Sequence, residues 1–342
     1  MPGVRDALLA GSDRSGYYLL KLATTELKTA ILGHPDFTAF TAKANKLFAK
    51  WKKANIPHLT GFPQDGHPKA LIEVIAEDLL NTFEKSPLLD PYDIYQHLMD
   101  YWAETMQDDC YLIAADGWVE AAKPRLIVEE KGKKTKVTPD FVFGKKKYQA
   151  ELIPPALIIA RYFSKEQAAI EALEAQAAAV QQQMEELAEE HGGEGGLLEE
   201  AKNDKDKLTR ASVAARLKEV KTDPDAADER QVLQQYVALS DQGGEAFGKL
   251  NAAQEVLIEQ VAAKYRLLAE DDVKTLVVDD KWLSTLAAVV QGELDRVSQT
   301  LTGRIRQLAE RYATPLPQLI DEVATLAARV DEHLKKMGAV WD

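Results

Sequence analysis

Apolar residues at alternating spacings of three and four restrict the second half of this chain to long helices with one apolar side. The clearest run between residues 164 and 191 follows Ile170, Leu173, Ala177, Val180, Met184 and Leu187. This is the heptad pattern of a helix that packs along a second helix. A glycine-rich turn follows over 192–196, and glycine favours the end of a helix. The pattern therefore predicts one long helix that ends near residue 191.

Two more apolar seams follow near the end of the chain. The first follows Trp282, Leu286, Val290, Leu294, Val297, Leu301, Ile305, Leu308 and Tyr312. Its mean period of about 3.7 residues predicts a nearly straight helix. The second lies after Pro315, and its candidate partner-interface residues are Leu319, Val323, Leu326, Val330, Leu334 and Met337. An apolar stripe of this kind lowers the solubility of a protein unless another helix covers it. The two seams can pack together as an antiparallel hairpin, or the second can face a partner protein.

The first part of the chain mixes helices with short β-prone runs. Helical spacing is found over Thr24–Leu32, Phe37–Ala54, Pro68–Phe83 and Asp93–Met106. We expect Asp36 to cap the second of these helices and Pro57 to lie beyond its end. The runs Tyr111–Ile113, Arg125–Val128 and Phe141–Phe143 predict a small unit of two or three strands.

These elements predict a mainly α fold, with a helical domain, a small β-hairpin insertion and then long coiled-coil-like helices. We expect a helical domain at 1–109 and a small β-containing linker unit at 110–163. A helical hairpin region with Gly-, Lys- and Asp-rich connections is expected at 164–275, and long C-terminal helices at 276–342.

Charge is distributed unevenly along the chain. Residues 1–163 hold 21 Lys and Arg and 21 Asp and Glu, whereas residues 164–342 hold 21 and 34 and so carry the whole net charge of −13. An acidic surface repels phosphates, so the first half is the better candidate for contact with DNA. Its predicted hairpin offers a possible DNA-backbone contact through Lys131, Lys133, Lys134, Lys136, Lys145, Lys146 and Lys147. A solvated hairpin whose edges are protected by lysines explains the same residues, and we favour that reading.

The sequence offers no candidate catalytic, cofactor-binding or metal-binding residues. Cys110 is the only cysteine and is expected to be a buried structural thiol. The pairs Asp108–Asp109 and Asp271–Asp272 are expected to be helix caps or solvated charge. Asp90-Pro91-Tyr92 resembles part of the adenine methyltransferase tetrapeptide, but a helix cap followed by a proline in the first turn explains it better. The six histidines show no metal-ligand spacing.

No apolar run reaches the ~20 residues that cross a bilayer, and the first residues lack the apolar core of a signal peptide. A single cysteine fits a reducing compartment. We therefore expect a cytoplasmic protein without membrane contact.

Several long segments resemble the C-terminal region of the modification subunit of type I restriction–modification systems. One of them is DIYQHLMDYWAETMQDDCYLIAADGW at Asp93–Trp118. The closing run LTGRIRQLAERYATPLPQLIDEVATLAARVDEHLKKMG at Leu301–Gly338 is also similar. Shorter likenesses lie at His34–Phe40, His67–Asp78, Glu151–Phe163 and Leu276–Gln291.

This resemblance implies an adenine-N6 DNA methyltransferase that uses S-adenosylmethionine when intact. In that family two modification subunits join one specificity subunit, a restriction subunit can join as well, and C-terminal helices pack on the coiled-coil spacers of the specificity subunit. The family's cofactor motif and its Asn-Pro-Pro-aromatic motif are missing from this sequence. We therefore expect no cofactor and no methyl transfer in this chain alone.

Two alternatives compete with that interpretation. The chain can be a stand-alone helical coiled-coil interaction protein without catalytic activity, or a complete enzyme whose site has no familiar motif.

Overall fold

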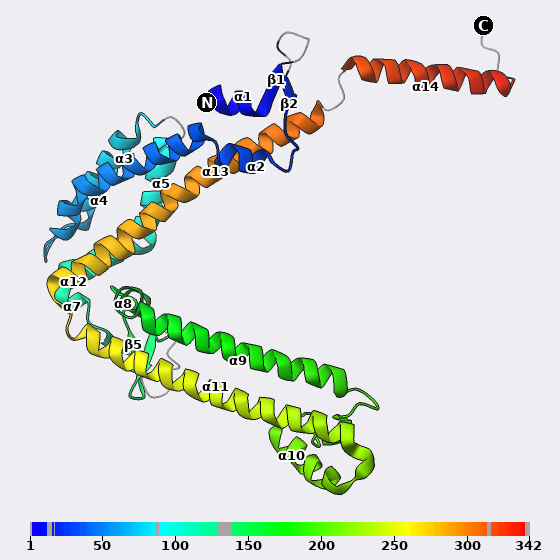
Figure 1. The fold of residues 1–342 in the computed structure, drawn as a ribbon. Coiled ribbons are helices and arrows are strands. Elements are labelled where there is room, and N and C mark those ends of the chain that lie inside the picture. Colours follow the sequence, from blue (N-terminus) through cyan, green and yellow to red (C-terminus); the bar gives the residue numbers. More distant parts are fainter. Residues whose placement is uncertain are drawn as a thin grey trace. The chain divides into compact units, whose positions relative to one another are not determined.

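The computed structural model describes residues 2–11, 16, 18–86, 89–128, 138–312 and 316–338. These residues are mainly helical, with two small antiparallel sheets, which confirms the predicted fold class (Figure 1). The chain forms two compact units. Unit 1 comprises Met1–Ala114 with Lys281–Asp342, and unit 2 comprises Ala115–Asp280. The predicted segments 1–109 and 276–342 therefore contribute mainly to the same unit.

Unit 1 is built from helices of both ends of the chain. They are α1 (Pro2–Leu8), α2 (Leu27–Leu32), α3 (Pro35–Thr60), α4 (Pro68–Phe83), α5 (Pro91–Tyr101), α6 (Gln107–Asp116), α13 (Ser284–Arg311) and α14 (Leu316–Lys336). A π-helical turn, Trp102–Met106, joins α5 to α6, and strands β1 (Leu9–Gly11) and β2 (Tyr18–Leu20) pair antiparallel. Helix α13 packs against α2, α3 and α5.

Prolines and short polar side chains define where these helices begin. Pro68 opens α4, as predicted. The Asp90 carboxylate accepts a hydrogen bond from the Tyr92 amide at 2.9 Å and caps α5, with Pro91 at the first helical position. The prediction for α3 is wrong by two residues, because His34 and not Asp36 is its cap. The Nδ1 atom of His34 accepts a hydrogen bond from the Asp36 amide at 3.1 Å.

Helix α3 also continues past its predicted end. Pro57 lies inside the helix, although proline lacks the amide hydrogen that an interior position normally donates. Leu59 is fully buried one half-turn later. Burial of a leucine stabilises by about 1.5–3 kcal/mol, which is comparable to the cost of about 3 kcal/mol for an interior proline. Tertiary packing therefore overrides the local stop signal.

The core of unit 1 lies between α3, α4 and α5. Trp51 is fully buried, and its indole nitrogen donates a hydrogen bond to the Ile75 carbonyl at 3.0 Å, which ties α3 to α4. The Asn55 amide donates to the Asp78 carboxylate at 2.6 Å across the same pair of helices. These two bonds satisfy polar groups that burial would otherwise leave without water.

A buried ion pair joins the two separate segments of unit 1. The Asp109 carboxylate is 4% exposed, accepts a hydrogen bond from the Trp282 indole nitrogen at 2.8 Å and lies 2.7 Å from the Lys281 ammonium. The expectation that Asp109 is a cap or a solvated charge is therefore wrong. Burial raises the pKa of Asp109 above its ordinary value, while the charge of Lys281 and the two hydrogen bonds act in the opposite direction.

Unit 2 holds a three-stranded sheet and a pair of long helices. Its helices are α7 (Trp118–Ala121), α8 (Pro155–Tyr162), α9 (Ser164–His191), α10 (Arg210–Glu219), α11 (Ala227–Tyr265) and α12 (Glu270–Lys274). The strands β3 (Arg125–Leu126), β4 (Phe141–Phe143) and β5 (Lys146–Gln149) form an antiparallel sheet in the order β3-β5-β4. Three short 3₁₀ turns, at Glu199–Ala201, Val220–Thr222 and Pro224–Ala226, lie between α9 and α11, and a π-helical segment, Thr275–Leu283, follows α12.

Two of the predicted strands differ from the structure. Tyr111–Ile113 belongs to α6, because Met106, Cys110 and Ile113 follow a helical spacing and all three are fully buried. A helix face that buries three side chains outweighs the β-preference of a three-residue run. The predicted strand Arg125–Val128 is reduced to its first two residues.

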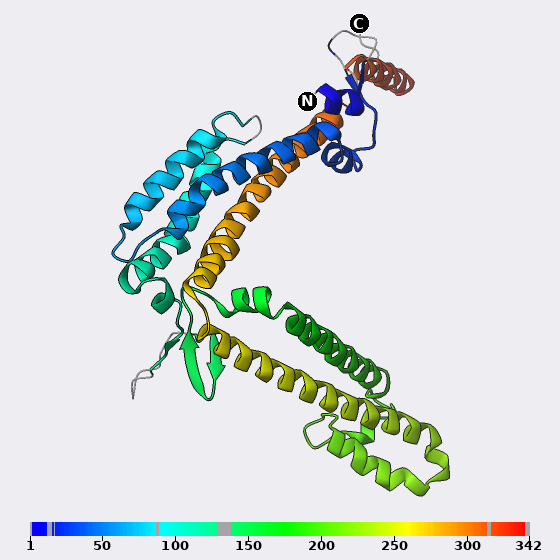
Figure 2. The same ribbon diagram turned by 60° about the vertical axis from the view of Figure 1, so that its left-hand side comes forward.

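Helices α9 and α11 lie side by side and antiparallel (Figures 1 and 2). The Gln254 amide donates to the Glu174 carboxylate at 3.1 Å, and further along the pair Gly243 lies against Val180. The predicted end of α9 is confirmed, since the Gly192 amide donates to the Ala188 carbonyl at 2.9 Å. The glycine-rich segment after it is therefore an interhelical turn.

The ion pair yields a first prediction. We expect Asp109→Ala to lower the free energy of unfolding by about 3–5 kcal/mol, because it removes the charge that faces the largely buried Lys281 ammonium. Urea unfolding, followed by circular dichroism and tryptophan fluorescence, measures this. Asp108→Ala is the matched control, because that neighbouring carboxylate is exposed, and it should change stability by less than about 0.5 kcal/mol.

A double replacement separates charge from shape. Asp109→Leu combined with Lys281→Met should recover part of the loss, because apolar side chains of similar volume replace buried ion pairs at little cost, whereas the Trp282 indole still loses its hydrogen bond to Asp109. A double variant as unstable as Asp109→Ala would contradict this account.

Candidate partner-binding and DNA-contact surfaces

Helix α14 exposes the apolar seam that the sequence predicts. Leu319, Val323, Leu326, Val330 and Met337 are between 43% and 81% exposed, and Leu334 is half-buried. Successive members are spaced 4, 3, 4, 4 and 3 residues apart, so the six side chains follow one face of a helix. We call these six residues the α14 face.

The seam of α13 has a different environment. Leu286, Val290 and Leu294 are at most 5% exposed, whereas Leu308 and Tyr312 at its far end are exposed. In the part of the chain that the structure describes, the α14 face is not covered by the α13 seam. The antiparallel hairpin of the two seams is thus not formed over the described residues, and the α14 face is exposed.

The predicted lysine-rich hairpin is formed by β4 and β5. Gly144 and Lys145 form its turn with φ values of +55° and +66°, the left-handed conformation that a tight two-residue turn requires. Lys145, Lys146 and Lys147 are exposed at its tip. Lys131, Lys133, Lys134 and Lys136 lie outside the described residues. Of the lysines predicted to contact the DNA backbone, the described ones are therefore those of one turn and the strand that follows it.

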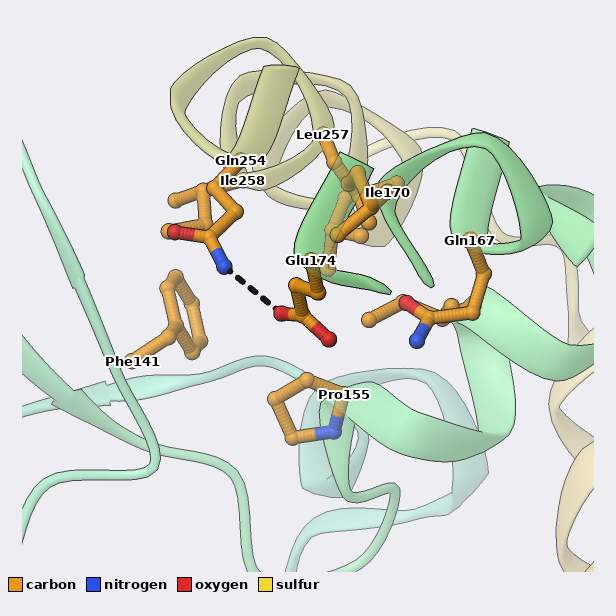
Figure 3. A pocket seen from close by; sticks show the side chains of 10 residues that line it. Phe141, Pro155, Gln167, Ile170, Glu174, Gln254, Leu257 and Ile258 are labelled. Atoms are coloured by element: carbon orange, nitrogen blue, oxygen red, sulfur yellow. Dashed lines mark hydrogen bonds between the residues drawn. The ribbon is translucent and has the colours of Figure 1, made fainter. Parts of the chain in front are cut away.

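A small apolar pocket lies where β4 meets the α9–α11 pair. Its volume is about 290 Å³, and Phe141, Pro155, Ile170 and Leu257 supply apolar walls (Figure 3). Its polar groups include Gln167 and the hydrogen-bonded pair Gln254 and Glu174. These groups can orient a ligand through hydrogen bonds.

The residues that sequence analysis tested for chemistry have structural roles. Cys110 is fully buried, as predicted, and burial together with the nearby Asp109 charge raises the pKa of its thiol to about 12. The Asp272 carboxylate accepts a hydrogen bond from the Ala269 amide at 3.1 Å, so the expectation of a helix cap is confirmed there. That bond, together with one from the Tyr162 hydroxyl, lowers the pKa of Asp272.

The described residues form neither a metal cluster nor a membrane-spanning helix. No three His, Cys, Asp or Glu side chains among them are placed to hold a metal ion. None of the helices over those residues combines the length and the apolar character needed to cross a bilayer.

Sequence analysis missed the residues that the fold brings to the hairpin. Lys123, Tyr265 and Arg266 line a pocket together with Phe141, Phe143 and Tyr148. Tyr265 and Arg266 end the long helix α11, more than a hundred residues after the hairpin in sequence. No local pattern marks them, because only the return of α11 to the sheet places them there.

Comparison with known proteins identifies no relative. No protein-family model matches the chain, and neither a curated protein nor a solved structure matches it. Function must therefore be argued from the residues and surfaces described above.

The buried thiol yields a second prediction. A thiol with a pKa near 12 is almost entirely protonated at pH 8, and the thiolate is the reactive form. Ellman's reagent should therefore label Cys110 only when unit 1 unfolds, and then completely. Rapid labelling of the native protein at a rate independent of denaturant would contradict this burial.

Proposed function

We propose that this chain is the C-terminal, partner-binding part of the modification subunit of a type I restriction–modification system. The single observation that carries the proposal is the exposed α14 face. The resemblance of Leu301–Gly338 to the family's closing segment falls on the same helix. In the proposed role, α14 docks on a helical spacer of the specificity subunit.

The energetics of the α14 face fit such a role. Covering a leucine or valine side chain contributes about 1.5–3 kcal/mol. Six side chains on one helix face can therefore supply the apolar part of a helix-in-groove or coiled-coil interface. The charged residues of α14 include both signs, such as the acids Asp321 and Glu322 and the base Arg329, and such charges select partners more than they add affinity.

The rest of the proposed complex follows from the resemblance. A second modification subunit and a restriction subunit are the other expected partners, and DNA is held within the assembly in the cytoplasm. Lys145, Lys146 and Lys147 are the described residues that can contact the DNA backbone. Methylation of adenine and binding of S-adenosylmethionine belong to the catalytic part of the intact family subunit.

The docking proposal gives a third prediction. We expect Leu326→Glu combined with Val330→Glu to abolish co-purification with the specificity subunit of the same system, because two buried carboxylates would lack partners. Ala328→Glu is the matched control, since residue 328 lies on the opposite side of α14 and should leave the complex intact. Co-expression followed by affinity purification and size-exclusion chromatography measures both.

The same variants distinguish docking from internal packing. All three substituted side chains are exposed, so the thermal unfolding of the chain should change little. Unfolding of the double variant would show that the face is part of the protein's own core. A specificity subunit that never co-purifies with the wild-type chain would favour the stand-alone interaction protein.

A methyl-transfer assay gives the fourth prediction. We expect the purified chain to incorporate no labelled methyl group from S-adenosylmethionine into DNA that carries the system's recognition site. The reason is that its sequence lacks the glycine-rich cofactor motif and the Asn-Pro-Pro-aromatic motif. The positive control is the assembled methyltransferase. Incorporation by the chain alone would support a complete enzyme with an unfamiliar site.

A further inference from the structure

A second pocket of unit 2 is aromatic and lies between the sheet and the end of α11. Its volume is about 350 Å³. We call it the aromatic pocket, and the residues that matter for its chemistry are Lys123, Phe141, Phe143, Tyr148, Tyr265 and Arg266.

Strand register places its aromatic rings on one face of the sheet. Phe141 is opposite Tyr148 in the antiparallel pair, and their rings stack with centroids 5.2 Å apart. Tyr265 stacks on Phe141 from α11 at 5.9 Å, and its hydroxyl donates to the Ile153 carbonyl at 2.6 Å. The three rings therefore form a fixed stack with little freedom to move.

Phe143 differs from the other rings of this pocket. It lies two residues along β4 from Phe141, so its side chain is on the same face of the sheet. It is half-buried, and among the described residues no aromatic ring stacks on it. Its ring can therefore stack on a flat group that enters the pocket.

The charged residues that line the pocket, among those that the structure describes, are cationic. They are Lys123 and Arg266. Arg266 is exposed, and Lys146 pairs with Phe143 across the hairpin. Lys123 forms an ion pair with Glu120, but both side chains are more than half exposed, and such pairs contribute little. A phosphate can compete with that carboxylate for the ammonium group.

We propose that the aromatic pocket binds one unpaired nucleotide of a nucleic-acid strand, with its base stacked on Phe143 and its phosphates held by Arg266 and Lys123. Aromatic stacking with cations beside it is how proteins bind single strands without reading their sequence. Lys145 at the hairpin turn and Lys146, which shares the face of Phe143, extend the cationic surface beyond one nucleotide, which favours a strand over a free nucleotide. The inference rests on the DNA contact proposed for this hairpin and is independent of docking by α14.

Binding of a fluorescein-labelled oligothymidylate of about 12 nucleotides, followed by fluorescence anisotropy at low salt, tests the proposal. We expect Phe143→Leu to weaken binding by roughly 5- to 100-fold, because leucine keeps the apolar volume but removes the ring. Phe143→Trp should retain binding. Val142→Ala is the matched control, because Val142 lies on the opposite face of β4 and should not alter affinity.

Three further probes separate the contributions. An abasic strand of the same length should bind the wild type about as weakly as oligothymidylate binds Phe143→Leu. Thymidine monophosphate should bind more weakly than the strand, because it lacks the neighbouring phosphates that the strand offers to the hairpin turn. Lys145→Ala combined with Lys146→Ala should weaken strand and duplex alike, whereas Phe143→Leu should leave duplex binding unchanged.

Equal affinity of the wild type and Phe143→Leu for the strand would overturn the proposal. The DNA-backbone contact of the hairpin lysines would still be supported if the lysine variant lost duplex binding. Thymidine monophosphate that binds as tightly as the strand would overturn the assignment to a strand. Absence of any strand or duplex binding would remove both DNA contacts, while co-purification with the specificity subunit would still report on α14.

Discussion

The ion pair of Asp109 with Lys281 holds together a unit whose two parts are separated by the whole of unit 2 in sequence. Chain connectivity alone does not close such a loop, and loop closure over more than a hundred residues has an entropic cost that contacts must offset. Because burying the two charges costs free energy, the pair adds little net stability. Displacing one partner from the other, however, would be strongly destabilising. Because Trp282 donates to the same carboxylate, the pair also fixes the register of the segment that leads into α13.

Local signals identified helix ends and seams but not the contacts that close the fold. The roles of Pro68, Asp90 and Gly192 at helix ends depend only on their own chemistry and on neighbouring residues, so the sequence alone predicts them. Asp109 does not, since an acid near a helix start looks solvated until a lysine 172 residues away is brought beside it. The α14 face is a mixed case. Its spacing predicts an apolar stripe, whereas its exposure depends on what every other helix already covers.

The proposed docking face and DNA-contact surface belong to different units and use different chemistry. The α14 face is apolar, so its affinity for a partner should depend weakly on salt. The hairpin has three exposed lysines, and each phosphate contact contributes a slope of about −0.9 to the logarithm of affinity against the logarithm of salt concentration. Salt titration therefore separates the two contributions in any assembly that contains both.

In the proposed assembly, the acidic second half gives a partner a role in bringing the chain to DNA. Residues 164–342 carry the entire net charge of −13, including the acidic surface of α9 and α11. That surface repels phosphates, so a few lysines on one hairpin bind DNA weakly on their own. A partner held by α14 and itself bound to DNA raises the local concentration of that hairpin near the phosphates without any new contact. Weak and partly nonspecific contacts then suffice, and sequence recognition can be left to the partner.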